Sequence, residues 1–538
     1  MLRALLLAVL VTVASAHDTP PLFEGLGTHH HPIATSSPEA QRYFDQGLTL
    51  VYAFNHDEAA RAFRRAAELD PRAAMPHWGI ALAIGPNYNL DVDPQREREA
   101  FGEIQRARRL RASEQERAYV DALARRFSDD PKANLNQLAR DYKEGMAALV
   151  RRYPDDLDAA TLYAESAMDL RPWQLWNADG TPAEGTEEIV AVLESVLQRD
   201  PDHPGANHFY IHAVEASRRP ERALPSAHRL ETLVPAAGHL VHMPSHIYMR
   251  TGDFIAAVRT NARAIEVDRA YLATTGPHDG AYAMMYVPHN VQFLTAAAGM
   301  AGCYTDARRG GEQLLEQASA PGDQMPPPDM LPMLEAALAQ PVFVTLRFQR
   351  WDDALAMPEQ PAFLRVIAAL RHCARGMAFA AARKWKDAET ERVAIAAART
   401  ALPERRMFGF TPASLIVELA EVELRARLAT ARGDRSGAVA EWTAAVALAD
   451  RITYAEPPDW YHPPRESLGA ALLAARRPTE AEAVFRADLE RNPRNGRSLF
   501  GLWHALETQK RSGDAAWVRR QFEQAWRDAD VPLHLADL

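Results

Sequence analysis

Two pairs of histidines with the same internal spacing are the residues of this sequence best suited to chemistry. His208 and His212 form the first pair, and His242 and His246 follow 34 residues later, member for member. Residues four apart lie on the same face of an α-helix, so each pair presents two imidazoles from one side of a helix. Imidazole is a common ligand of copper, zinc and iron. The pattern therefore predicts a transition-metal site and leaves the identity of the metal open.

Additional potential ligands lie at positions related to these pairs. Glu215 follows His212 by three residues and His239 precedes His242 by three, so both continue the histidine faces by nearly one helical turn. After an interruption of the repeat, His289 takes the place of His239. The predicted metal ligands are His208, His212, Glu215, His239, His242, His246 and His289.

Carboxylates near the same face could give such a site a catalytic role. In the preceding repeat, Glu165 occupies the position of His212, and Asp169 follows one turn later. Carboxylates can complete a metal shell, orient imidazoles or transfer protons, so Glu165 and Glu215 are the candidate catalytic residues. The alternative without a metal is that the histidines are ordinary helix residues hydrogen-bonded to carboxylates. The sequence contains no P-loop, dinucleotide fingerprint or HExxH motif.

The elements that must position these residues are helices. Apolar residues recur at helical spacing almost throughout, which predicts an all-α fold. The clearest unit runs from Ala40 to Arg72. Its first helix has a small residue at Gly47, its second has Ala59 and Phe63, and Pro71 ends it. The same spacing returns near the C-terminus as Gly469, Ala481, Phe485 and Pro493.

This pattern resembles the tetratricopeptide (TPR) repeat, a helical hairpin of 34 residues that stacks on copies of itself. The resemblance implies a solenoid with a concave groove, in which one side of each first helix lines the groove. The histidine pairs lie one residue after the packing positions, so we expect them to face the groove. A protein, a peptide or a small-molecule ligand is the expected partner there.

Four longer segments resemble a family of exported bacterial TPR proteins that is mostly uncharacterised. The segments read FDQGL…YAFNHDEAARAF, HWGIALAIGPNYN, NHFYIHAVEAS and GHLVHMPSHIYMRTGD. The resemblance supports the fold and export, and it implies no particular reaction or ligand.

Two interruptions divide the repeats. Residues 269–288 insert about half a repeat rich in turn-forming residues, and residues 318–332 are a Pro-rich linker candidate. The predicted organisation is a signal peptide (1–16), an irregular leader (17–37), an N-terminal array (38–317), a linker (318–332) and a C-terminal array (333–538). The His29-His30-His31 tract of the leader could add ligands, cover the site, or simply lie on the surface.

The bulk properties exclude some classes of function. A net charge of −10 over 538 residues gives no reason to expect nucleic acid as a partner. Beyond the N-terminus no stretch approaches the roughly 20 apolar residues of a membrane span, so the mature chain is expected to lack an integral membrane segment. Cys303 and Cys373, the only cysteines, lack the spacing of a metal site and are expected to be free, buried thiols.

Three functions remain open after the sequence is read. The first is an exported TPR solenoid whose groove binds a transition metal (copper, zinc or iron) together with a peptide or small ligand. The second is a metal-dependent enzyme, a hydrolase or an oxidoreductase, that uses the same residues. The third is a metal-free scaffold for protein interactions in the cell envelope.

The N-terminus generates the first prediction, which is export with removal of 16 residues. Arg3 precedes an apolar run from Ala4 to Ala14, and Ala14-Ser15-Ala16 has the form of a cleavage site. The mature protein should therefore be periplasmic or secreted and begin at His17. Mass spectrometry of protein fractionated from a bacterial host measures this, and an intact Met1 in the exported fraction would contradict it.

Overall fold

The computed structural model describes residues 19–91, 93–276, 280–319, 330–460 and 462–538. The predicted signal peptide, His17 and most of the predicted linker lie outside these ranges. Contacts divide the chain into two compact units, residues 1–159 and 160–538. This division falls at a place where the sequence analysis expected no boundary, and each unit is described by itself.

The first unit consists of helical hairpins preceded by residues 19–37, which form no helix or strand. Its helices are α1 (Pro38–Tyr52), α2 (His56–Leu69), α3 (Ala74–Ile84), α4 (Pro94–Ala107), α5 (Glu114–Leu123), the 3-10 turn η1 (Ala124–Arg126) and α6 (Leu135–Arg152). Helix α7 (Leu157–Met168) begins in the first unit and continues into the second.

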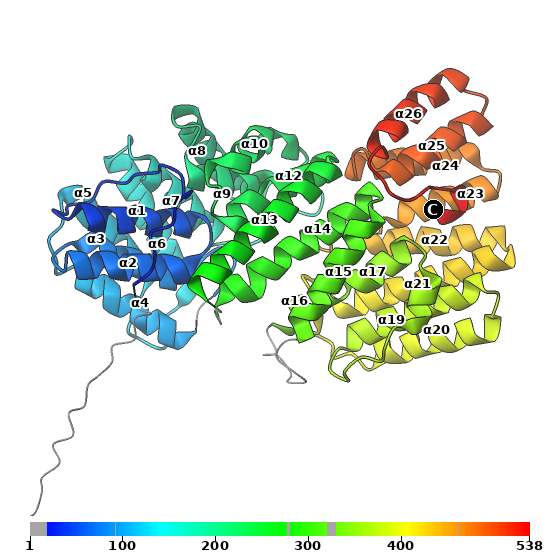
Figure 1. The fold of residues 1–538 in the computed structure, drawn as a ribbon, viewed down its shortest axis with the longest axis horizontal. Coiled ribbons are helices and arrows are strands. Elements are labelled where there is room, and N and C mark those ends of the chain that lie inside the picture. Colours follow the sequence, from blue (N-terminus) through cyan, green and yellow to red (C-terminus); the bar gives the residue numbers. More distant parts are fainter. Residues whose placement is uncertain (1–18, 92, 277–279, 320–329, 461) are drawn as a thin grey trace, which may run out of the picture. The chain divides into compact units, whose positions relative to one another are not determined.

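The second unit is also built of successive antiparallel helices, which Figure 1 shows lying side by side. Its first half contains α8 (Thr186–Arg199), α9 (Pro204–Val214), η2 (Pro220–Ala223), α10 (Leu224–Leu233), α11 (Gly238–His242), α12 (Pro244–Thr251), α13 (Phe254–Thr275), the π-helix η3 (Tyr282–Tyr286), α14 (Val287–Ala301) and α15 (Tyr304–Ser319). Its second half contains α16 (Leu331–Leu338), α17 (Gln340–Arg347), α18 (Trp351–Ala356), α19 (Arg365–Ala381), α20 (Trp385–Thr400), β1 (Met407–Phe408), β2 (Thr411–Pro412), α21 (Ala413–Arg432), α22 (Arg435–Ala449), α23 (Pro464–Ala474), α24 (Pro478–Arg491), α25 (Gly496–Thr508), α26 (Ser512–Ala525) and η4 (Leu535–Asp537).

The all-α, TPR-type class predicted from the sequence is confirmed. Among the described residues, the only strands are β1 and β2, which form one short antiparallel pair. Cys303 and Cys373 are free and buried.

Phe63 shows why the repeat needs small residues at fixed places. It is fully buried on α2, between α1 and α3. A Cβ atom at Gly47 on α1 would lie 2.6 Å from the Phe63 ring, and one at Gly79 on α3 would lie 2.5 Å from it. Phe485 on α24 takes the same place against Gly469 and Gly501. The glycines therefore let neighbouring helices approach the aromatic ring closely.

One part of the second unit differs from the sequence prediction. Residues 269–288 were expected to be mainly turns, but α13 continues through Thr275, and η3 leads directly into α14. Two hydrogen bonds support this helical course, because the Tyr282 hydroxyl donates to Asp268 Oδ1 over 2.7 Å and Asn290 Nδ2 donates to Asp268 Oδ2 over 2.6 Å. Turn-forming residues alone did not reveal these contacts. Residues 277–279 lie outside the described part.

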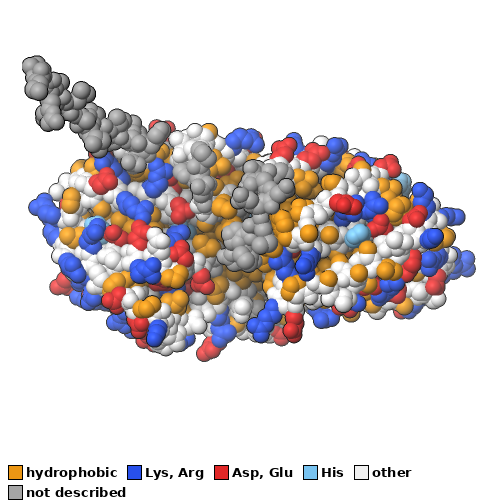
Figure 2. Space-filling view, turned by 90° about the horizontal axis from the view of Figure 1, so that it is seen from below, with side chains coloured by type: hydrophobic (Ala, Val, Ile, Leu, Met, Phe, Trp, Pro, Cys, Tyr) orange, Lys and Arg blue, Asp and Glu red, His pale blue; other side chains and the backbone are white. Residues whose placement is uncertain are grey.

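The surface shows mixed charge. On the face in Figure 2, Lys and Arg side chains are interspersed with Asp and Glu side chains. Within the described ranges, no helix combines the length and the apolar character that crossing a membrane requires.

The packing of Phe63 generates a matched pair of glycine substitutions. Gly79→Ala should lower the free energy of unfolding by about 1–3 kcal/mol, because its methyl group enters space that the Phe63 ring fills. Gly102→Ala on α4 should raise it by roughly 0.5–1 kcal/mol, because nothing lies within 4 Å of the added atom and alanine favours a helix. Urea denaturation followed by circular dichroism measures both, and equal effects would refute this account of the packing.

Candidate metal centre

Four helices of the second unit carry six histidines into one cluster. His208 and His212 come from α9, His239 and His242 from α11, and His246 from α12. His289 comes from α14. We call His208, His212, His239, His242, His246 and His289 the histidine cluster.

Local sequence signals place these helices. α9 begins at Pro204, and the side chain of His203 caps it by accepting a hydrogen bond from the Ala206 backbone N–H over 3.1 Å. Pro244 opens α12, and Gly252, in the left-handed region with φ of 78°, ends it. At the start of α11, a side chain at Gly238 would collide with Asp268 of α13, so this glycine permits the close approach of the two helices.

The cluster is enclosed by protein. His208, His242 and His246 are 0 % exposed, and His212 and His239 are 3 % and 2 % exposed. The sequence analysis expected these imidazoles to face an open groove. Aromatic rings enclose them instead, because Trp173 packs against His212, Tyr286 against His239 and Phe293 against His246.

Glu215 joins the two histidine pairs. Its Oε1 lies 2.8 Å from His212 Nδ1, and its Oε2 lies 2.5 Å from His246 Nδ1. Burial alone would raise the pKa of Glu215, but the neighbouring His246 and His212 lower it to about 2. The carboxylate is therefore ionised and accepts a hydrogen bond from each Nδ1–H, which leaves each Nε2 as the nitrogen with a lone pair.

A second acceptor fixes His242 in the same way. His242 Nδ1 lies 2.6 Å from Asn261 Oδ1, while Asn261 Nδ2 donates to the Ala257 carbonyl oxygen over 2.7 Å. The amide is thus oriented with its oxygen towards His242, whose proton sits on Nδ1. His242 Nε2 and His246 Nε2 are 2.9 Å apart. Two lone pairs therefore face each other across a hydrogen-bond distance.

Two arrangements can relieve this repulsion. A metal cation can bind both lone pairs, or an additional proton can lie between the nitrogens and create an imidazolium. Burial opposes the second arrangement, because it lowers the pKa of His242 well below its usual value and contributes most to lowering that of His289 to about 3. Burial likewise lowers the pKa of His212 and of His239. Burial therefore disfavours the imidazolium.

The predicted metal ligands are brought together. Groups of potential ligand atoms within 4.8 Å of one another include His208, His212 and His239; His242, His246 and His289; and His212, Glu215 and His246. No such group among the described residues contains Glu165 or Asp169.

Two residues near the cluster were not predicted as part of it. Asn261 lies on the buried stripe of α13 with Ala257, Ala264 and Asp268, and a polar residue on such a stripe is a signal that the sequence did offer. Glu456 comes from a segment more than 200 residues after Glu215 in the sequence. Burial and, to a smaller extent, the negative charge of Glu215 raise the pKa of Glu456 to about 7. Local spacing does not reveal this contact.

Two histidines of the leader tract and two charged residues of α23 also have structural partners. In the first unit, His29 Nε2 and His31 Nδ1 lie 2.9 and 2.8 Å from the two oxygens of Asp158, which attaches the leader to the start of α7. In the second unit, Arg465 forms two hydrogen bonds with Asp450. Glu466 pairs with Arg347 and Arg497, each at 2.7 Å.

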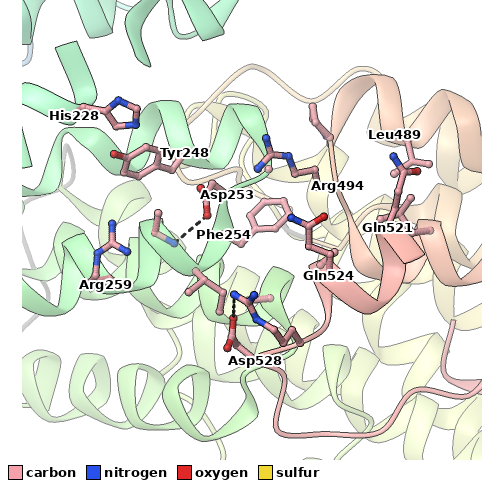
Figure 3. A pocket seen from close by; sticks show the side chains of 18 of the residues that line it. His228, Tyr248, Asp253, Phe254, Arg259, Leu489, Arg494, Gln521, Gln524 and Asp528 are labelled. Carbon is pink, nitrogen blue, oxygen red and sulfur yellow. Dashed lines mark hydrogen bonds and ion pairs between the residues drawn. The ribbon is translucent and has the colours of Figure 1, made fainter. Parts of the chain in front are cut away.

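A cavity of about 780 Å³ lies elsewhere in the second unit. Figure 3 shows side chains of α12 and α13 on one side, including Tyr248 and Phe254, and those of α24 and α26 on the other, including Leu489 and Gln524. Its charged lining residues are Glu231, Asp253, Arg259, Arg494, Arg527 and Asp528. None of the cluster histidines lines it.

Comparisons with known proteins leave the function open. No family model matches the chain, and no curated protein matches it. Similar solved structures include human IFIT1 in a dimer with m7Gppp-AAAA, at 13% identity, 93% and 92% coverage of the two chains and a TM-score of 0.31. Yeast Tom70 is 11% identical, with 90% and 92% coverage of the two chains and a TM-score of 0.28. The Cut9–Hcn1 structure is 10% identical, with 93% and 89% coverage and a TM-score of 0.31. TM-scores this low support no inference about the ligands of this chain.

Glu215 generates a prediction about stability. Glu215→Gln keeps the size of the side chain but replaces one acceptor oxygen with an N–H donor, which then faces the Nδ1–H of His212 or His246. The unmet hydrogen bond should lower the free energy of unfolding by about 1–3 kcal/mol. Urea denaturation measures the effect, with Glu221→Gln, whose side chain is 50% exposed, as the control that should change little. A loss no larger than that of the control would contradict the role given to Glu215.

Proposed function

We propose that this chain is an exported TPR-type protein that binds a transition metal through the histidine cluster. The observation that carries the proposal is the pair of His242 and His246 Nε2 atoms at 2.9 Å, with both Nδ1 atoms held by acceptors. Hydrogen bonds from the outer nitrogen to a carboxylate or an amide are the usual way in which proteins orient metal-binding histidines. The all-nitrogen surroundings suit copper, zinc and iron.

Burial favours binding of the ion over catalysis on a large substrate. Only His289 in the cluster is partly exposed, and aromatic residues surround the others. A hydrolase or an oxidoreductase would need an open path to its ion, and Glu215, one of the two candidate catalytic residues, already bridges two imidazoles. The proposal is therefore a metal-binding role.

We also propose a peptide or small-molecule partner, and the cavity in Figure 3 supports this part of the proposal. Its volume is within the range of small-ligand sites. The mixture of acidic and basic side chains suits a polar ligand that carries both charges and offers no continuous basic surface for nucleic acid.

Elemental analysis of the mature protein, purified without a histidine tag, tests the metal. We expect bound copper, zinc or iron, and we expect His208→Ala/His242→Ala to lose it while helix content in circular dichroism is kept. His228→Ala on α10, an exposed histidine outside the cluster, is the control and should retain the metal. Added metal should raise the melting temperature of the wild type only where the cluster is intact.

A protein that neither contains metal nor takes it up would overturn the proposal. The cluster would then hold an additional proton between His242 and His246, and the metal-free scaffold would become the better interpretation.

A further inference from the structure

The histidine cluster consists of two sets of three with a common plan. The first triad is His208, His212 and His239, and the second triad is His242, His246 and His289. In each triad the potential ligand atoms lie within 4.8 Å of one another. No group of four histidines meets this limit in the part of the chain that the structure describes. A single ion bound by all the histidines is therefore not what the geometry favours.

The internal distances of the two triads correspond member by member. Ring centroids are 4.9 Å apart for His208 and His212, and 4.8 Å apart for the equivalent His242 and His246. Each first histidine lies 4.9 Å from the third member of its triad. The rings of the second and third members are 6.5 Å apart in the first triad and 6.0 Å apart in the second.

This agreement has a structural cause. The first two members are related by the 34-residue repeat, but the third members, His239 and His289, are 50 residues apart. The long α13 and the π-helix η3 lie between them, and α14 brings His289 back to the equivalent place. The second triad thus repeats the arrangement of the first, although a long insertion separates His289 from His242 and His246.

We propose that the two triads bind two late first-row transition-metal ions in adjacent three-histidine centres. The inference rests on the metal site proposed above and specifies its number of ions and its ligands. Each centre has three imidazoles, which leaves a position for water or a small anion, as in zinc sites with three protein ligands.

The nitrogen distances suit this coordination. The Nε2 atoms of His208 and His239 are 3.2 Å apart in the first triad, and those of His242 and His246 are 2.9 Å apart in the second. With metal–nitrogen bonds of about 2.0–2.1 Å, these separations correspond to angles at the ion of about 100° and about 90°. Both angles are ordinary for copper or zinc.

Glu215 connects the two centres. It accepts a hydrogen bond from His212 of the first triad and from His246 of the second, whose rings are 5.3 Å apart. His239 of the first triad and His242 of the second are also in contact, with ring centroids 5.5 Å apart. One carboxylate therefore orients a ligand of each ion, and the two ions lie close enough to influence each other.

Titration of the untagged apoprotein with Zn²⁺ and, separately, with Cu²⁺ tests the number of ions. The wild type should bind two ions per chain. His208→Ala/His239→Ala, in the first triad, and His242→Ala/His289→Ala, in the second, should each bind one. His228→Ala should still bind two. In the copper-loaded wild type, electron paramagnetic resonance should show magnetic coupling between the ions, and each triad variant should give the uncoupled signal of a single Cu²⁺.

The outcomes separate this inference from the proposed function. One ion in the wild type, or the loss of all metal in both triad variants while circular dichroism shows a native fold, would leave a metal protein but overturn the two centres. No metal in the wild type would overturn both proposals. If a double variant unfolds, His289→Gln and His239→Gln replace it, since each removes one ligand, and a selective weakening of one of two binding steps supports the pair of centres.

Discussion

The double hydrogen bond of Glu215 is the interaction on which the arrangement of the site depends. A carboxylate with 2 % exposure has lost its hydration and needs donors to remain ionised. His212 and His246 supply them, each through Nδ1. Their rings are thereby fixed in one tautomer, with both Nε2 atoms directed into the cluster. α9 and α12 are held together by the same residue, and Arg250 of α12 adds a hydrogen bond to the Glu215 carbonyl oxygen over 2.9 Å.

The repeat explains how a scaffold made of similar hairpins can build such a site. Stacking places equivalent residues of successive first helices near each other, so a histidine pair in one repeat meets its copy in the next. A single hairpin could supply only one pair. The insertion before α14 then contributes His289 and Phe293, and Phe293 packs against His242, His246 and His289. The site therefore combines regular repeats with a local departure from them.

The sequence was sufficient for the parts of this structure that follow from short-range spacing. The positions of Gly47 and Phe63 predicted the first hairpin, and the 34-residue offset brought His208, His212, His242 and His246 together as expected from neighbouring helices. His239 and His289 could also be found, because repeat position relates them. The place of Glu165 stays a prediction, since the irregular residues 169–185 separate its helix α7 from α8.

Other contacts depend on how distant segments fold back, which spacing does not encode. Trp173 reaches His212 from a loop whose Trp176 donates to the Ala213 carbonyl oxygen over 2.8 Å. Glu456 approaches Glu215 from the second half of the same unit. These segments change the character of the site, because they turn an expected groove surface into an enclosed one.

Enclosure is also the strongest physical constraint on what the cluster can be. Water that would otherwise solvate the imidazoles is excluded from His208, His242 and His246, which are fully buried. An additional proton on an imidazole in such surroundings would carry the cost of a buried charge. In the proposed metal-bound form, one ion would satisfy several nitrogens at once, and Glu215 would balance part of its charge. Burial would therefore make the proposed metal-bound form a stabilising element of the fold.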